Sequence, residues 1–519
     1  MSPRIRRSFV EVGDGLIHFR YAGSGPALAM LHQSPQNSRM WLEQIERLAD
    51  RYLVIAPDLP GFGWSDRLPV EQPTIADLAS TLNSWLDVLG IEQCAVFGMH
   101  TGAIVAVHMG LERPDRIARV LVDGYAIFNG QERALLGERY LPPFQPDWSG
   151  QHLRWLWARM REQSFFFPWY EQTADCALRF PAPDLEKTQA AVLDILEVGD
   201  QYRLGYRAAI NCSDRSRVAD LAMPALLYYR EDDVLITHRQ RLPALPDHIN
   251  APALPDREAL WAEIDAELAR WNGPVQTIKI PPSGPGWQRM VMATEAGELA
   301  CWMHQPLAQP KCCRLVVHGL GQAPMPRVTP EENTLVLQPD LPGHGASAEW
   351  PAHRLSKQHL LDALINLVDQ LATQLPLVIE SHAASSSLAV SLAEQLAGRV
   401  SQLVLVKPWL IDRDQRDWLL AHLPDMTPRP AGGHLLEAWQ WERERHLFTP
   451  WQAATAENRR PGDAPAVDQV HANAVILIGL GRAFKPLLAD CLAPDSRDQL
   501  KAFNVPVEIL GASSNAEKS

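Results

Sequence analysis

An internal repeat with a spacing of 282 residues constrains the fold more than any other feature of this chain. Residues 57–63 read PDLPGFG, and residues 339–345 read PDLPGHG. Further pairs at the same spacing are His152 and His434, Trp157 and Trp439, Pro168-Trp169 and Pro450-Trp451, and Pro224 and Pro506. Self-similarity at a fixed period indicates a duplicated structural unit. The 519 residues therefore predict two related domains, each long enough to form its own core.

Each copy alternates predicted strands and helices around a helical, aromatic insertion. This alternation predicts a mostly parallel sheet with helices on both faces, which is the α/β class. We expect a first domain at 1–275 with a helical cap at about 125–220, a Pro- and Gly-rich linker at 276–286, and a second domain at 287–519 with a cap at about 410–500. The second copy ends soon after its last expected strand, so we expect it to be C-terminally truncated.

A histidine stands at the expected tip of a sharp turn in each copy. Residues 94–103 (CAVFGMHTGA) read as a buried strand, a turn and the start of a helix, with His100 at the centre. In the G-x-S-x-G arrangement, small residues flank one strained position that carries a nucleophilic serine. Residues 377–385 (LVIESHAAS) predict a second such turn with His382 at its tip. Ser381 comes one residue earlier and should not point into a pocket.

The ordered set of motifs resembles the α/β-hydrolase superfamily over nearly all of both copies. In the first copy the set comprises a loop at His32, a turn at Asp58, the elbow at His100, a cap insertion and an acid, Asp233, after a late strand. This copy is similar to a bacterial subgroup with an H-Q-[ST]-P loop and a G-x-H-T-G elbow. The resemblance implies the fold but no substrate, because this scaffold hosts many chemistries.

The resemblance also implies a site. In this superfamily the elbow side chain attacks a carbonyl, and two backbone N–H groups stabilise the oxyanion. The corresponding N–H groups here belong to Ser34 and Thr101, and Asp233 takes the position of the acid. His248 is the candidate for the remaining histidine. It lies only 15 residues after Asp233, so it is either a site residue or a histidine of a surface loop.

His100 has three possible roles: a nucleophile that forms an acyl-imidazole, a general base that activates water, or a remnant in a dead pocket. An imidazole with a pKa of about 6.5 can accept a proton from water near neutral pH. A hydrogen bond to Asp233 would give a His–Asp pair that needs no serine. The hydroxyls of Ser34 and Thr101 are alternative nucleophiles. The strain of an elbow favours a functional residue at its tip.

Composition excludes several other classes of protein. His32, His100, His248 and Asp233 are of types that bind zinc, but their spacing shows no metal signature, and we expect neither metal nor cofactor. The seven scattered cysteines indicate free thiols in a reducing cytoplasm. A net charge of −13 without a basic stretch argues against nucleic acid. There is no signal-peptide core, and no apolar run reaches the roughly 18 residues of a membrane span.

We therefore expect a hydrolase whose first copy cleaves a small ester, thioester, lactone or C–C bond through His100 and Asp233. The substrate would be apolar or aromatic if Trp155, Trp157 and residues 165–167 line the pocket rather than pack the cap. The second copy, with Asn515 at the position of Asp233, should be non-catalytic. It could pair with the first copy, or the chain could form a homo-oligomer, to cover a sheet edge. The alternative is a catalytically silent protein of this fold that binds a small molecule or partner; a lyase or cofactor-free oxygenase is a variant of the enzyme.

Overall fold

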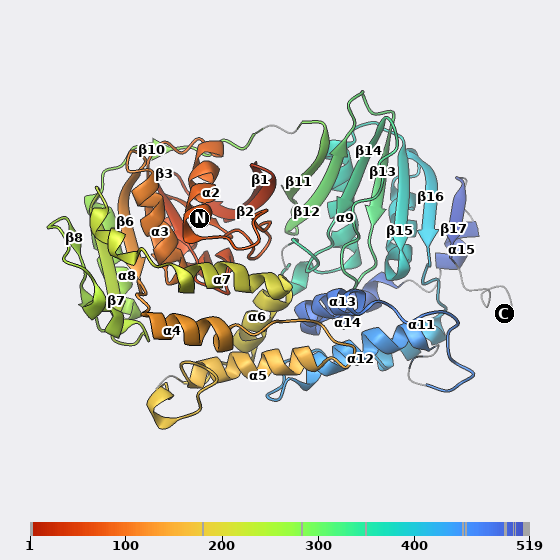
Figure 1. The fold of residues 1–519 in the computed structure, drawn as a ribbon. Helices are drawn as coiled ribbons and strands as arrows, with labels where there is room; N and C mark the ends of the chain where they lie inside the picture. Colours follow the sequence, from red (N-terminus) through yellow and green to blue (C-terminus); the bar gives the residue numbers. More distant parts are fainter. Residues whose placement is uncertain are drawn as a thin grey trace. The chain divides into compact units, whose positions relative to one another are not determined.

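The chain forms two compact units in a computed structural model. The structure describes residues 4–178, 181–281, 284–347, 350–448, 451, 454–492, 496–501, 503 and 505–511. Unit 1 comprises Met1–Gln145 and Ala158–Pro282, and unit 2 comprises Pro146–Trp157 and Ser283–Ser519 (Figure 1). The division after residue 282 falls inside the predicted linker. No helix of the described residues is long and apolar enough to cross a bilayer.

The sheet of unit 1 has the strand order β1-β2-β4-β3-β5-β6-β7-β8, with β10 beside β3 and β9 beside β7. Its strands are β1 (Arg6–Val12), β2 (Gly15–Ala22), β3 (Gly25–Leu31), β4 (Leu53–Pro57), β5 (Cys94–Met99), β6 (Ile117–Asp123), β7 (Ala225–Arg230), β8 (Ile249–Asn250), β9 (Ala253–Leu254) and β10 (Val275–Gln276). The ladder is antiparallel from β1 to β4 and parallel from β4 to β8. Strands β4 and β5 are apolar and almost wholly buried, as expected where helices cover both faces. The predicted α/β class is confirmed.

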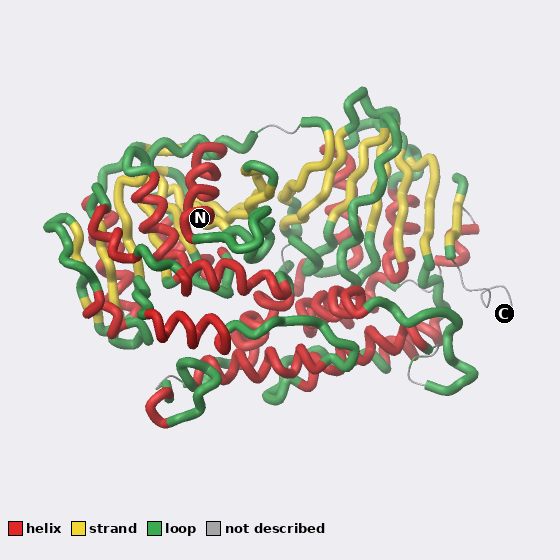
Figure 2. The backbone as a smooth tube through the Cα atoms, viewed as in Figure 1, coloured by secondary structure: helices red, strands yellow, loops and turns green. Residues whose placement is uncertain are grey.

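Helices of unit 1 fall into two groups. Those interleaved with the strands are α1 (Leu42–Leu48), α2 (Ile75–Val88), α3 (Thr101–Glu112) and α8 (Arg257–Arg270). The insertion between β6 and β7 holds α4 (Gly130–Leu135), α5 (Gln151–Phe165, whose residues from 158 onward belong to this unit), α6 (Leu185–Leu196) and α7 (Tyr202–Asn211). Short helical turns lie at Ser38–Trp41, Leu136–Tyr140, Ala174–Cys176, Gly199–Gln201, Arg215–Asp220 and Ile236–Arg241. Figure 2 shows the interleaved helices beside the strands, and the insertion lies where the sequence predicted a cap.

One core of unit 1 joins the sheet to α1 and α8. Trp41, Phe97 and Ile264 are buried together in it, and the edge of the Trp41 ring packs on Phe97. The sheet also extends past the predicted boundary at 275, because Gln276 pairs with Gly25. The linker therefore starts later than its composition indicated.

Unit 2 repeats the strand order of unit 1 as β11-β12-β14-β13-β15-β16-β17. The strands are β11 (Gly286–Ala293), β12 (Glu298–Gln305), β13 (Cys312–Val317), β14 (Thr334–Pro339), β15 (Leu377–His382), β16 (Val400–Val406) and β17 (Val507–Leu510). They are antiparallel from β11 to β14 and parallel from β14 to β17. The directions thus match those of the first seven strands of the sheet in unit 1. Asn515, the predicted counterpart of Asp233, lies outside the described residues.

The helices of unit 2 follow the same plan. Interleaved with the strands are α9 (Lys357–Leu371), α10 (Ser386–Gln395) and α15 (Ser496–Lys501), and the insertion holds α11 (Arg413–Ala421), α12 (Gly433–Leu447), α13 (Val467–Leu480) and α14 (Phe484–Cys491). Short 3-10 turns lie at Ala352–Arg354, Ala383–Ser385 and Gly481–Ala483.

Residues 146–157 pack within unit 2, although the sequence placed them in the first cap. The Trp157 indole N–H donates to the Pro430 carbonyl oxygen at 3.0 Å, and the Trp439 indole N–H donates to the Trp148 carbonyl oxygen at 3.1 Å. Both indole side chains are almost fully buried. Of the two roles considered for Trp157, packing is therefore the one the structure supports.

Candidate active site

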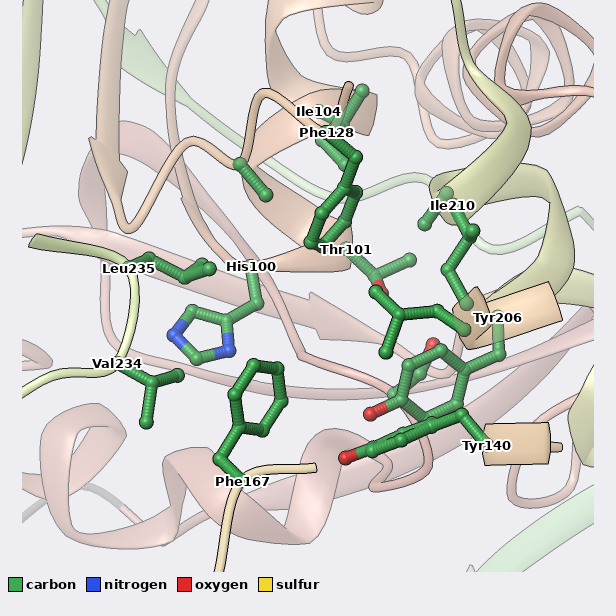
Figure 3. Close-up of a pocket in the computed structure, with 14 residues that line it drawn as sticks. His100, Thr101, Ile104, Phe128, Tyr140, Phe167, Tyr206, Ile210, Val234 and Leu235 are labelled. Carbon is green, nitrogen blue, oxygen red and sulfur yellow. The ribbon is translucent and has the colours of Figure 1, made fainter. Parts of the chain in front are cut away.

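His100 occupies the turn between β5 and α3 in a strained backbone conformation. Its φ of 49° and ψ of −104° lie in a region that residues other than glycine rarely adopt. A Cβ on Gly102 would meet the Leu31 carbonyl oxygen at 2.3 Å, so only glycine allows α3 to approach the loop after β3. This turn directs the imidazole into a pocket (Figure 3).

The structure brings His100 and Asp233 into contact. The His100 Nε2 atom lies 2.9 Å from Asp233 Oδ2, and the other carboxylate oxygen accepts the Leu235 N–H at 2.9 Å. Burial raises the pKa of the Asp233 carboxyl, but the charge and hydrogen bond of His100 reduce it to about 2. Burial lowers the pKa of His100, but the Asp233 carboxylate outweighs this effect, so the imidazole has a pKa above its ordinary value. Each group therefore favours the charged form of the other.

Two residues beneath this pair were not predicted from the sequence. Arg230 is buried at the end of β7, and its guanidinium contacts Asp233 Oδ2 at 3.0 Å and Asp123 Oδ2 at 3.0 Å. Asp123 ends β6, the neighbouring parallel strand. Charged residues that end adjacent parallel strands meet at one sheet edge, and this signal could have identified both. Arg230 and His100 contact the same oxygen, Oδ2, of Asp233, so Arg230 helps to hold the carboxylate in place.

The pocket in front of His100 is small and mostly apolar. It has a volume of about 60 Å³, and Figure 3 shows Tyr140, Phe167 and Tyr206 of the insertion facing the imidazole. A larger cavity of about 450 Å³ shares these residues and also reaches Asp233. Because Nε2 is bound to Asp233, Nδ1 is the ring nitrogen that remains for chemistry. Of the aromatic residues predicted to line a pocket, Phe167 does so.

The two tyrosines place hydroxyl groups in an otherwise apolar wall. Burial, together with the neighbouring hydroxyl of Tyr140, raises the pKa of Tyr206 well above its ordinary value. Burial also raises the pKa of Tyr140. Both hydroxyls therefore stay protonated. They hydrogen-bond each other, so one proton is engaged within the pair and the other is left to donate to a bound oxygen or halogen atom. No periodic signal in the sequence predicts these tyrosines, because one lies in the Leu136–Tyr140 turn and the other on α7.

Ser34 and Thr101 lie beside His100 as the sequence predicted. Both line the small pocket, and the described residues give neither backbone N–H a hydrogen-bond acceptor. The Ser34 hydroxyl is buried without a hydrogen-bond partner among the described residues. His32 has a structural role, because its Nε2 accepts the Leu59 N–H at 2.8 Å and its Nδ1 donates to the Gln33 carbonyl oxygen at 3.0 Å.

His248 does not reach this group, which corrects its assignment as a site residue. Its Nε2 donates to the Leu221 carbonyl oxygen at 2.8 Å, and its own carbonyl accepts the Ala225 N–H at the start of β7. Asp233 follows the other end of that strand, and six residues of strand span about 20 Å. The 14 residues between Asp233 and His248 return the chain to the start of the next parallel strand. The same separation of about 20 Å between His248 and Asp233 excludes a metal site that includes both residues, which residue types alone had allowed.

The tip of the elbow in unit 2 lies one residue later in the chain than predicted. His382 ends β15 with an extended φ of −121°, and Ala383 has the positive φ of 47°. The ladders agree, because His382 pairs with Val406 as Met99 pairs with Asp123. The tip of this turn is therefore alanine. His382 instead contacts Glu380 Oε1 at 2.8 Å.

In unit 2 a serine contacts the loop after β13, which corresponds to the loop beside His100 in unit 1. Ser385 Oγ donates to the His318 carbonyl oxygen at 2.7 Å and accepts the Leu320 N–H at 3.0 Å. Leu320 is two residues after His318, as Ser34 is two residues after His32. The N–H that would stabilise an oxyanion in unit 2 is therefore already bound.

Comparison with known proteins finds similarities that lie in unit 1. Residues 26–266 match the family described as alpha/beta hydrolase fold. A fluoroacetate dehalogenase from Burkholderia sp is 34% identical over 142 residues, which cover 26% of this chain and 46% of that protein. Epoxide hydrolase 2 of Siraitia grosvenorii is 34% identical over 154 residues, with coverages of 26% and 46%. Haloalkane dehalogenase 2 of Mycobacterium bovis is 31% identical over 108 residues, with coverages of 21% and 38%.

These matches span less than half the length of each relative. Among solved structures, a hydrolase from Pseudomonas aeruginosa is 20% identical with a TM-score of 0.39, covering 51% of this chain and 95% of that one. Epoxide hydrolase A from Mycobacterium thermoresistibile is 22% identical with a TM-score of 0.40, covering 53% and 99%. The family match lies within unit 1, whose mostly parallel sheet carries the strand-to-helix elbow at His100.

Proposed function

We propose that unit 1 is a hydrolase of small acyl compounds in which His100, paired with Asp233, takes the place of the usual serine. The bond cleaved would be that of an ester, thioester or lactone, or a C–C bond next to a carbonyl. The observation that carries this proposal is the 2.9 Å contact between His100 Nε2 and Asp233 Oδ2 at a strained elbow. This contact orients the ring and leaves Nδ1 as the reactive nitrogen in a small pocket.

The geometry supports two routes through the same imidazole. As a nucleophile, Nδ1 attacks the acyl carbon and expels the leaving group, and water then releases the acid from the acyl-imidazole. As a general base, Nδ1 accepts a proton from a water molecule that attacks the carbonyl directly. In both routes the N–H groups of Ser34 and Thr101 are placed to stabilise the oxyanion, and Asp233 stabilises the positive charge on the ring. Both routes require His100 to be neutral before reaction.

The tyrosine pair supports a second candidate reaction, the hydrolysis of an epoxide or a carbon–halogen bond. Relatives of the matched segment are named as epoxide hydrolases and dehalogenases. The hydrogen-bonded hydroxyls of Tyr140 and Tyr206 line the pocket with His100, where the pair has one proton left to donate to a departing oxygen or halide. His100 would act in this reaction as nucleophile or base, as it does towards an acyl group.

We also propose that the two units arose by tandem duplication and that unit 2 is non-catalytic. The 282-residue repeat and the shared order of seven strands support the duplication. The alanine at the second elbow and the bound Leu320 N–H support the loss of catalysis in unit 2.

A substrate screen tests the proposed reaction. The purified chain would be assayed with short p-nitrophenyl esters, acyl thioesters, lactones, epoxides and haloalkanoates, beside a His100→Gln variant. We expect turnover in at least one class and its loss in the variant. A pre-steady-state burst of p-nitrophenol would identify the nucleophilic route. If no class is turned over and ligand binding is unchanged in His100→Gln, the hydrolase proposal is wrong and the catalytically silent binding protein is the remaining alternative.

A further inference from the structure

A second cluster of reactive side chains lies in unit 1, away from His100. His108 is on α3, two helical turns beyond the elbow, which corresponds to about 12 Å along the axis. Cys212 follows the last residue of α7, and Asp214 precedes the helical turn Arg215–Asp220. Helix α3 packs against both α7 and this turn, and the three side chains therefore converge from segments 104 residues apart in sequence.

The ligand atoms of this cluster point at one another. His108 Nε2 lies 3.7 Å from Cys212 Sγ and 3.5 Å from Asp214 Oδ1, and Cys212 Sγ lies 3.1 Å from the same oxygen. In tetrahedral zinc sites the bonds are about 2.3 Å to sulfur and about 2.0–2.2 Å to nitrogen or oxygen, which sets the ligand atoms about 3.3–3.6 Å apart. Shifts of a few tenths of an ångström would therefore let one ion contact all three.

We propose that His108, Cys212 and Asp214 form a transition-metal site that binds Zn²⁺. A sulfur, a nitrogen and an oxygen donor suit zinc, whereas Mg²⁺ and Ca²⁺ take oxygen ligands. A thiolate and a carboxylate together balance the charge of a divalent ion. Arg217 is 3.6 Å from Asp214 Oδ2, which leaves Oδ1 directed to the cluster.

The surroundings give the ion access and leave one coordination position open. All three residues line a cavity of about 920 Å³. His108 is buried, and the other two residues are partly exposed to this cavity. The fourth position of the ion therefore faces solvent-accessible space, where water can complete the tetrahedron.

A bound ion would join α7 to α3. Helix α7 carries Tyr206 and α3 begins at Thr101, and both residues line the pocket at His100. The bound ion would therefore connect two walls of that pocket. The proposal does not depend on the proposed reaction, because ligand identity and affinity are measured without substrate.

Metal binding and X-ray absorption test this site directly. The intact chain would be stripped with a chelator, reloaded with Zn²⁺ and examined at the zinc edge. We expect one zinc per chain with one sulfur at about 2.3 Å, the distance of a zinc–thiolate bond. Measurements on the wild-type protein are enough to overturn the proposal, either by a zinc environment without sulfur or by failure to retain zinc after reloading.

Variants then assign the ligands. Cys212→Ser and His108→Gln should each weaken zinc binding by about 100-fold or more, since changes outside the first ligand sphere already cost about 10–100-fold. The matched control is Cys176→Ser, which removes another partly exposed thiol of unit 1 and should leave the affinity unchanged. Zinc should raise the unfolding temperature of the wild type and of Cys176→Ser but not of Cys212→Ser. Equal weakening in Cys176→Ser and Cys212→Ser, or in neither, would refute the assignment.

Discussion

The elbows of the two units carry different residues at the same strained position. Both turns join a buried strand to a helix at equivalent positions in sheets of the same strand order. In unit 1 the strained position carries His100. In unit 2 it carries Ala383, and Ser385 binds the Leu320 N–H. A histidine in the elbow sequence therefore enters the strained position in one unit and not in the other.

Replacing the two histidines gives the largest expected contrast. His100→Ala should reduce turnover about 10⁶-fold, the size of loss seen when a nucleophile or base is removed from a triad. His382→Ala should leave turnover unchanged, because that side chain lies before the tip and contacts Glu380. Both are measured as kcat on the substrate found by screening. Equal losses in the two variants would contradict the assignment of chemistry to unit 1.

Asp233→Asn should have the next largest effect. The amide can still contact Nε2, but it cannot stabilise a positive charge on the ring, and it favours the wrong tautomer. We expect kcat to fall by a factor on the order of 10⁴, as in comparable aspartate-to-asparagine changes. Circular dichroism would confirm that the variant is folded. A loss of less than tenfold would mean that His100 acts without its partner.

Gly102→Ala should give a moderate effect on both stability and rate. Its methyl group would meet the Leu31 and His32 carbonyl groups of the backbone, which cannot move independently of the sheet. We expect a loss of about 1–3 kcal/mol in unfolding free energy, typical of overpacking, together with reduced turnover. Ser385→Ala in unit 2 is the control and should leave turnover unchanged. If Gly102→Ala has the stability and turnover of the wild type, the close approach of α3 to the loop after β3 does not require glycine.

The smallest predicted effect is a change in the pKa of His100. Because Asp233 raises this pKa above its ordinary value, kcat/KM should rise with pH as the imidazole loses its proton at a pH above about 6.5. In Asp233→Asn the burial effect remains without the carboxylate, so the pKa should decrease. Nuclear magnetic resonance titration of the ring measures both values. His18, whose pKa burial lowers to about 4, is an internal reference that should not change.

Much of the first site could be predicted from linear motifs. His100, Ser34 and Thr101 stand in short segments whose residues meet locally, and Asp233 follows a strand whose position the repeat helped to define. The prediction that His248 belongs to the site was wrong, because chain order does not reveal which edge of the sheet a loop reaches. The prediction for His382 was wrong because the elbow strand of unit 2 is displaced by one residue from the 282-residue spacing, so its tip falls on Ala383. A cytoplasmic location remains a prediction from the sequence.

The α/β class and the position of the elbow in unit 1 follow from the amino-acid sequence alone. Periodic burial and glycine-rich turns encode these features within short segments. The folded structure is needed to find that Arg230 joins Asp123 to Asp233, that two cap tyrosines face His100, and that His108 meets Cys212. These contacts join side chains from separate strands and helices, and their distances depend on how the elements pack rather than on any spacing along the chain.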